Sequence, residues 1–157
     1  MKIPLPLRYA LFISLCLLLW LAFEALVGLH DKYIAYHPYL SMLSVFIPVV
    51  FGYLAVKDKR SQLDGTITFK QALLTGVAVV VITAVLAVPV QLVFHYWINP
   101  YFFEDMIEYA VNNGKSSPEQ AAMYFNITSY IIQSVLGTLV FGNIIALVVA
   151  LLMRTKK

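Results

Sequence analysis

The chain has 157 residues, about the length of one domain, and 61% of them are hydrophobic while only 12% are charged. Soluble domains average roughly 45–50% apolar and about 25% charged residues, so this composition argues against a water-soluble fold. The net charge of +3 does not indicate nucleic-acid binding, because the basic residues lie beside apolar segments rather than on one water-facing surface. The single cysteine, Cys16, excludes an intrachain disulfide and a metal–thiolate cluster.

The first long apolar segment covers residues 9–29, which is enough to cross the roughly 30 Å hydrocarbon core of a bilayer. Lys2 and Arg8 precede it, as in a signal peptide. However, the segment is longer than the usual apolar region of a signal, and Glu24 interrupts the small-residue pattern of a cleavage site. We therefore expect it to be retained as a transmembrane helix.

Two further spans are predicted at residues 39–56 and 69–97. Pro48 lies in the middle of the second span and Pro89 within the third, and each should bend its helix, since proline has no amide hydrogen to donate. The third span begins with a predicted capping box, in which Thr68 accepts from the amide of Gln71 and the Gln71 side chain reaches back.

An outer hairpin over residues 98–129 separates the third span from the fourth, which covers residues 130–153. Within the hairpin, residues 103–112 predict a short amphipathic helix. Ser117 and Gln120 match a second helix cap, and we expect one uninterrupted helix from Ser117 to Met153 whose first turns stand clear of the bilayer.

The basic residues predict the orientation of these spans. Nine of them flank the first span's start, the turn after the second span, and the chain end, while the opposite side holds only Lys32 and Lys115. Because basic residues concentrate in cytoplasmic loops, both termini should be cytoplasmic. The predicted fold is therefore an all-α, integral-membrane four-helix bundle, formed by a single transmembrane domain.

Small side chains recur at every fourth position of the fourth helix, at Ser134, Thr138, Gly142, Ala146 and Ala150. Such a face lets another helix backbone approach closely inside a membrane. The pattern favours packing within one bundle. The alternative is a surface for a homo-oligomer or for another membrane subunit.

Polar residues inside the spans form a candidate cluster. Glu24, Gln91 and Gln133 should lie at a similar depth in the outer leaflet, with His95 one turn from Gln91. A Glu24–His95 pair would suit a proton relay, but hydrogen bonding at the membrane interface, with Glu24 extending to water, is the favoured interpretation. Asn143 should lie near mid-bilayer and hydrogen-bond to another helix.

No residue pattern predicts a catalytic, cofactor-binding or metal site. His30, His37 and His95 are all expected on the outer side, but no two of them have the i, i+4 spacing that places two ligands on one helix face. The sequence also lacks a nucleophile elbow and a glycine-rich phosphate loop. We therefore expect no enzyme activity and no cofactor.

The turn between the second and third spans carries a resemblance. Gly52 ends the second span, basic residues follow at 57–59, and a Gly-x-Ile-x-Phe motif at residues 65–69 opens the third. In this the chain resembles a bacterial membrane-protein family catalogued as domain of unknown function 4199. The resemblance implies four spans, a basic cytoplasmic turn, a hydrophilic hairpin and a basic tail, but no activity and no functional residues.

Together, these patterns predict a multi-pass membrane protein, and the resemblance implies that it resides in the inner membrane of a bacterium. We expect a non-enzymatic accessory or interaction component that acts through membrane lipids or other membrane subunits. A homo-oligomeric transporter or channel for protons or small solutes is the alternative, based on the intramembrane polar residues.

Overall fold

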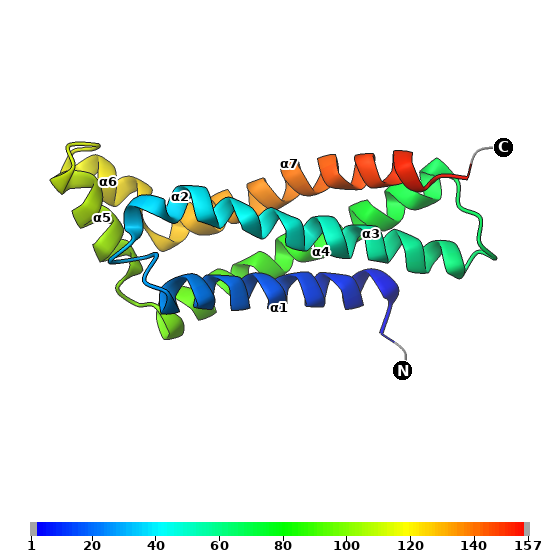
Figure 1. Cartoon of the computed structure of the whole chain (residues 1–157), viewed down its shortest axis with the longest axis horizontal. Coiled ribbons are helices and arrows are strands. Elements are labelled where there is room, and N and C mark those ends of the chain that lie inside the picture. The colour runs from blue at the N-terminus through cyan, green and yellow to red at the C-terminus, as the bar shows by residue number, and fades with distance from the viewer. Residues whose placement is uncertain (1–2, 156–157) are drawn as a thin grey trace.

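Four long apolar helical segments run alongside one another for most of the length of the molecule (Figure 1). They comprise Leu5–Leu26, Ile34–Ser61, Phe69–Ile98 and Ile127–Met153, and each is long and apolar enough to cross a membrane. This computed structural model describes residues 3–155, and no β-strand occurs within that range. The predictions of an all-α fold and of four apolar helices able to span a membrane are confirmed.

The first segment is helix α1 (Leu5–Leu26), and the second is built from four consecutive helical pieces. These are η1 (Ile34–Tyr36), α2 (His37–Leu40), η2 (Ser41–Val45) and α3 (Phe46–Ser61), where η1 and η2 are 3-10 helices. Pro48 lies in the first turn of α3, so its missing amide hydrogen falls where 3-10 geometry gives way to α-helix. The whole segment covers Ile34–Ser61, so it is longer at both ends than the predicted span of residues 39–56.

The third segment consists of α4 (Phe69–Val93) and one π-helical turn, η3 (Phe94–Ile98). The predicted capping box is confirmed: the Gln71 amide donates to Thr68 Oγ1 at 3.2 Å, and the Thr68 amide donates to Gln71 Oε1 at 2.9 Å. Pro89 lies inside α4, and the wider turn follows it. Phe94 and His95, which lie in this turn, are both buried.

Two short helices, α5 (Phe102–Asn112) and α6 (Pro118–Tyr124), cover one end of the bundle (Figure 1). The predicted cap at Ser117 is confirmed, with the Gln120 amide donating to Ser117 Oγ at 3.3 Å. Phe102, Met106 and Ala110 are buried, which places one face of α5 against the bundle.

The prediction of one uninterrupted helix from Ser117 to Met153 is wrong. The chain breaks between α6 and α7 (Ile127–Met153) at Asn126, whose backbone is extended (φ −150°, ψ 163°). Its side chain accepts from the Ser129 amide at 3.0 Å and so caps α7. Asparagine is among the best residues for this position, so the signal for the break was present in the sequence.

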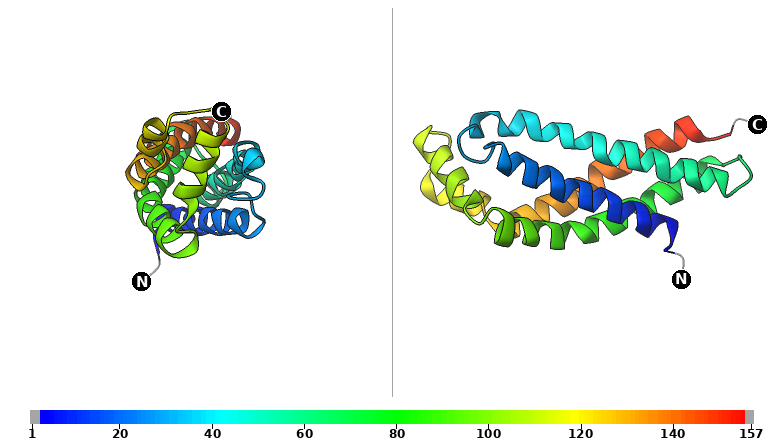
Figure 2. Two further views of the ribbon diagram at one scale, coloured as in Figure 1. Left: turned by 90° about the vertical axis from the view of Figure 1, so that its left-hand side faces the viewer. Right: turned by 60° about the horizontal axis from the view of Figure 1, so that its bottom comes forward.

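Helices α4 and α7 pack at unusually close range. A methyl group added at Gly76 would lie 2.7 Å from Ala146 Cβ, and one added at Gly142 would lie 2.8 Å from Val80 Cγ1. Only glycine at these two positions allows the helices to come this close. The two further views in Figure 2 show α7 crossing α4, with α1 and α3 on the other side of the bundle.

Both ends of the described chain lie at the end of the bundle opposite α5 and α6 (Figure 1). There Asp58 Oδ2 accepts from Arg8 Nη2 at 2.6 Å and from the Tyr9 hydroxyl at 2.7 Å, which ties α3 to α1. The tail is fixed in a similar way, because the Thr155 amide donates to the Ile67 carbonyl at 2.9 Å. We refer below to this end as the terminal end and to the other as the hairpin end.

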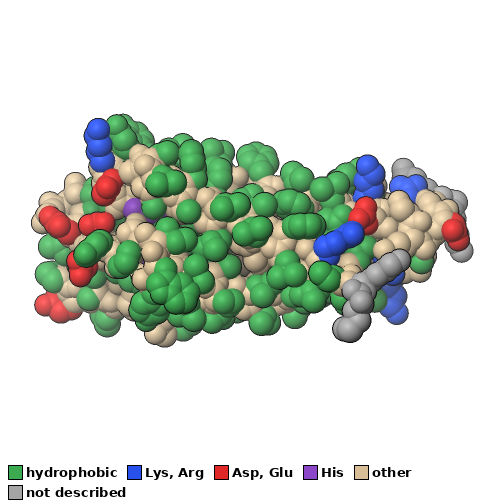
Figure 3. Space-filling model, turned by 90° about the horizontal axis from the view of Figure 1, so that it is seen from below, with side chains coloured by type: hydrophobic (Ala, Val, Ile, Leu, Met, Phe, Trp, Pro, Cys, Tyr) green, Lys and Arg blue, Asp and Glu red, His purple; other side chains and the backbone are tan. Residues whose placement is uncertain are grey.

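The side of the bundle in Figure 3 is covered by apolar side chains along its middle, while charged side chains gather near the two ends. Large apolar residues from all four long segments are exposed, among them Leu19, Tyr53, Val85 and Leu136. An apolar surface of this extent suits contact with lipid rather than with water.

Candidate functional site

A cavity of about 360 Å³ lies at the hairpin end of the bundle, between α1, η2, α4 and α7. Polar side chains from each of these elements or their neighbours line it: Glu24, His37, Ser41, Gln91, His95, Gln133 and Ser134. We call it the polar cavity. The structure thus brings together four of the five residues of the predicted intramembrane cluster and adds His37 and Ser41.

Gln91 links α4 to α7 across this cavity. Its Nε2 atom donates to Ser134 Oγ at 2.5 Å, and its Oε1 atom lies 2.9 Å from His95 Nε2. With the amide in this orientation, Gln91 Oε1 accepts and the proton of His95 lies on Nε2; the opposite orientation of the amide would pair with the other tautomer. His95 Nδ1 is buried and has no hydrogen-bond partner among residues 3–155.

His95 is packed among aromatic rings and does not reach Glu24. Its ring stacks on Phe103 at a centroid distance of 4.2 Å and meets Tyr130 edge-on at 5.6 Å. The hypothesis of a Glu24–His95 pair therefore does not match the structure. The imidazole instead contacts Gln91 of α4, Phe103 of α5 and Tyr130 of α7.

Glu24 is fully buried, with 0% of its surface exposed. One carboxylate oxygen, Oε1, accepts from Trp20 Nε1 at 2.6 Å and from Ser41 Oγ at 2.6 Å. The expectation that Glu24 extends to water is wrong, because these two donors and the fold-back of the chain after α1 enclose it. Two hydrogen bonds to one oxygen fix the orientation of the other oxygen, Oε2.

Two histidines face Glu24 Oε2. His30 Nε2 lies 3.4 Å from it and His37 Nε2 lies 3.8 Å from it. The reversal between α1 and η1 makes this possible: Gly28 has φ +77°, a left-handed conformation that few other residues adopt, and its carbonyl accepts from the Tyr33 amide at 2.7 Å. The chain therefore turns back beneath the end of α1 and places His30 beside Glu24.

Sequence reasoning missed the convergence of Glu24, His30 and His37. On one continuous helix, spacings of six and seven residues would place the side chains about 9 and 10.5 Å apart along the axis, too far to share a ligand, so a search for ligands one turn apart cannot find them. Gly28 was the available signal, since a glycine at the end of an apolar helix is typical of a tight reversal.

The remaining predicted polar residues have simpler environments. Gln133 Oε1 accepts from the Tyr124 hydroxyl at 3.1 Å at the edge of the polar cavity. Asn143 Nδ2 donates to the Leu139 carbonyl at 2.6 Å, one turn earlier in α7. Asn143 thus finds its partner on its own helix rather than on another one, contrary to our expectation.

The small-residue face of α7 points into the bundle. Gly142, Ala146 and Ala150 are buried, with Ala146 next to Gly76. Ser134 bonds to Gln91, and Thr138 lines the interior cavities. The face is therefore occupied by contacts within the same chain.

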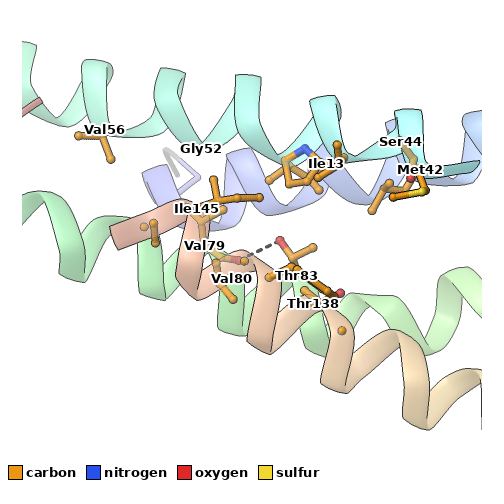
Figure 4. Close-up of a pocket in the computed structure, with 18 residues that line it drawn as sticks. Ile13, Met42, Ser44, Gly52, Val56, Val79, Val80, Thr83, Thr138 and Ile145 are labelled. Atoms are coloured by element: carbon orange, nitrogen blue, oxygen red, sulfur yellow. Dashed lines mark hydrogen bonds between the residues drawn. The ribbon is translucent and has the colours of Figure 1, made fainter. Parts of the chain in front are cut away.

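A second cavity, of about 430 Å³, continues from the polar cavity toward the terminal end. Figure 4 shows this cavity between α3 on one side and α4 and α7 on the other. Ile145 points across the cavity toward Gly52, and α1 contributes Ile13 to the lining. Its lining is almost entirely apolar, and we call it the apolar cavity. Five residues line both cavities, which therefore adjoin: Leu17, Ser44, Thr83, Gly137 and Thr138.

Acidic residues surround the hairpin end above the polar cavity. Asp105 lies near Asp31, Glu104 and Glu108, and partial burial together with these negative neighbours raises the pKa of Asp105 above its ordinary value. The nearby His30 opposes this effect and lowers the same pKa. Asp105 and the buried His30 are thus close enough to influence one another electrostatically.

Residues 8–155 match the family described as "Protein of unknown function (DUF4199)". The chain belongs to this family. The match covers nearly the whole chain and confirms the resemblance carried by the turn at residues 57–69. No curated protein and no solved structure matches the chain, so the cavities of this DUF4199 member are interpreted from their own chemistry.

Proposed function

We propose that this DUF4199 protein is a non-enzymatic membrane component that binds a lipid-like molecule with one apolar chain and a hydrogen-bonding head. The adjoining cavities carry this proposal, because one is lined by apolar side chains and the other by hydrogen-bonding side chains. A ligand of this kind would place its chain against residues such as Val56 and Val80 and its head near Gln91 and Ser134.

The apolar cavity has side chains at its edge that face outward from the bundle. Met42, Val45 and Phe141 line the cavity and are also exposed on the surface. In a bilayer these residues would contact lipid tails, so the phase that surrounds the cavity is itself made of apolar chains. This argues for a ligand that enters sideways from the membrane.

Gly137 allows a direct test, since it lines both cavities and a methyl group there would meet no atom within 4 Å. Gly137→Phe should project a ring into the junction without displacing the backbone. Leu136→Phe is the matched control, because Leu136 is exposed on the outer side of the same helix.

Native mass spectrometry of the protein, taken from its own membranes in lipid nanodiscs, is the measurement. The expected result is a bound lipid-like mass on the wild type and on Leu136→Phe that is lost, by tenfold or more in occupancy, from Gly137→Phe. A wild-type protein that carries no such mass would overturn the proposal. Stoichiometric foreign subunits in the same spectrum would instead support an accessory role through protein partners.

The second candidate is a proton-coupled or small-solute transporter that works as a homo-oligomer. The chain of contacts from His95 through Gln91 to Ser134, inside the membrane-spanning part, favours it. Glu24 is a buried carboxylate that lines the same polar cavity. In proteoliposomes, Glu24→Gln should therefore abolish pH-dependent flux if this candidate is correct. Flux absent from the wild type would eliminate it.

We further propose that the protein resides in the bacterial inner membrane with both termini in the cytoplasm. The gathering of Lys57, Lys59, Arg60, Lys70 and Arg154 at the terminal end supports this orientation. In a Cys16→Ser background, an impermeant maleimide added outside intact cells should label Lys115→Cys and leave Lys59→Cys unlabelled. The reverse pattern would overturn the orientation.

A further inference from the structure

Three potential metal ligands converge at the hairpin end. A metal site formed by them would not depend on the ligand-binding role proposed above. Glu24 comes from the last turns of α1, His30 from the reversal that follows, and His37 from the start of α2. One ligand atom from each lies within 4.8 Å of the other two. We refer to these residues as the Glu24–His30–His37 triad.

The distances within the triad do not suit direct hydrogen bonds. A charge-assisted bond between an imidazole nitrogen and a carboxylate oxygen has a length of about 2.7–2.9 Å. Glu24 Oε2 instead lies 3.4 Å from His30 Nε2 and 3.8 Å from His37 Nε2. Two atoms bound to one tetrahedral zinc ion at about 2.0–2.1 Å are separated by about 3.4 Å, which matches the shorter spacing.

Two of the three ligand atoms are buried and unpaired. Within residues 3–155, Glu24 Oε2 and His30 Nε2 have no hydrogen-bond partner, and their side chains are 0% and 2% exposed. A buried carboxylate oxygen without a donor is costly, and so is an unpaired ring nitrogen. A cation between them would satisfy both atoms at once.

Side chains outside the triad hold two of its three ligands. Trp20 and Ser41 both donate to Glu24 Oε1, which directs Oε2 toward the histidines. His30 Nδ1 lies 3.2 Å from the side-chain amide of Asn99. A half-turn of that amide would present its oxygen to an Nδ1 proton, which leaves Nε2 with the lone pair that a metal needs.

Access to the triad comes from two directions. His37 is partly exposed and lines the polar cavity together with Ser41, so a water or a ligand head could complete the coordination from there. The acidic residues that surround Asp105 give the hairpin end a negative potential, which draws cations toward it.

We propose that Glu24, His30 and His37 form a binding site for a divalent first-row transition metal, with Zn²⁺ the best match to two imidazoles and one carboxylate. Imidazole donors disfavour Ca²⁺ and Mg²⁺, which prefer oxygen ligands. Three protein ligands leave one coordination position open toward the polar cavity. Trp20 and Ser41 are positioning residues for Glu24, and Asn99 is one for His30.

Zinc binding to the purified, chelator-treated protein in nanodiscs tests the site by calorimetry and by elemental analysis after removal of free metal. We expect one zinc per chain on the wild type. His37→Gln should weaken binding at least 100-fold, because it removes one of the three ligands. The variant should still fold, because His37 is partly exposed. His95→Gln is the matched control, because His95 lines the same cavity outside the triad, and it should retain one zinc.

X-ray absorption on the zinc-loaded wild type tests the ligands without any variant. The expected first shell holds two imidazole nitrogens and at least one oxygen donor. A sulfur ligand, fewer than two imidazoles, equal loss of zinc in His37→Gln and His95→Gln, or no zinc on the wild type would each overturn the proposal. Retention of the zinc by a folded Glu24→Gln variant at wild-type affinity would do so too.

Discussion

Glu24 Oε2 and His30 Nε2 face each other at 3.4 Å in a fully buried location, although their residues are separated by a helix end and a tight reversal. Neither residue determines this relationship alone. The orientation of the carboxylate depends on Trp20 and Ser41, and the position of the imidazole depends on the left-handed turn at Gly28.

Ser41→Ala should destabilise the protein by about 1–3 kcal/mol, because it removes a donor from a buried carboxylate oxygen. The same change should lower zinc affinity by roughly 10–100-fold if the triad binds metal. Ser44→Ala is the control, since Ser44 Oγ donates to the Ser41 carbonyl within its own helix. Unfolding in mixed micelles and zinc titration measure the two effects, and equal losses in both variants would contradict the prediction.

Gly76→Ala should destabilise the bundle by about 1–3 kcal/mol, because the new methyl group would lie 2.7 Å from Ala146 Cβ and the helices would have to separate. Gly137→Ala makes the same chemical change where no atom lies within 4 Å. It should be neutral or slightly stabilising, since alanine favours helix over glycine by about 1 kcal/mol. The free energy of unfolding in micelles distinguishes them, and similar values would contradict the close packing of α4 on α7.

Much of the fold was predictable because membrane spans depend on signals carried by single segments. Apolar length identifies the four helices that are able to span a membrane, and the caps at Thr68 and Ser117 follow from local side-chain chemistry. The sequence does not predict the break at Asn126, because the polar stretch before α7 is also compatible with a helix that extends beyond the bilayer. A capping residue such as Asn126 is harder to recognise when helix-favouring residues precede it than when a turn does, as at Ser117.

The candidate site was only partly predictable for a different reason. Depth along a span can be counted, so Glu24, Gln91, His95 and Gln133 were grouped, and all four line the polar cavity. Counting residues does not show which way a side chain points around the helix axis, nor the path that a loop takes. His95 lies in the π-helical turn and packs on Phe103 and Tyr130, and the reversal at Gly28 brings His30 beside Glu24.

Asn126→Ala should destabilise the protein by about 0.5–2 kcal/mol through loss of the α7 cap. The Asn126 amide also donates to the Ala122 and Met123 carbonyls, so the variant should also loosen the end of α6. Asn112→Ala is the control, because Asn112 makes one exposed bond to Glu108. Hydrogen exchange should rise at residues 118–129 in the first variant alone, and unchanged exchange there would contradict the assigned cap.

Asp105 and Glu119 should show opposite pH dependence. Burial and the negative charges of Asp31 and Glu104 raise the pKa of Asp105 in the folded state, so the native state binds the proton more tightly than the unfolded state. Stability is then lost as pH rises from the ordinary aspartate pKa through the raised value. Asp105→Asn should be more stable than wild type at pH 7, by less than about 1 kcal/mol because exposed charges are screened, and equal to it at low pH.

Glu119 has the opposite sign, since its own backbone amide and the Ser117 side chain lower its pKa in the folded state. The charged form is the one stabilised, so its contribution is complete above the ordinary glutamate pKa and is lost as pH falls through the lowered value. Glu119→Gln should therefore be less stable than wild type at pH 7 and equal to it in acid. Thermal unfolding of both variants across this range measures the effect, and differences of the same sign at pH 7 would contradict the electrostatic account of the hairpin end.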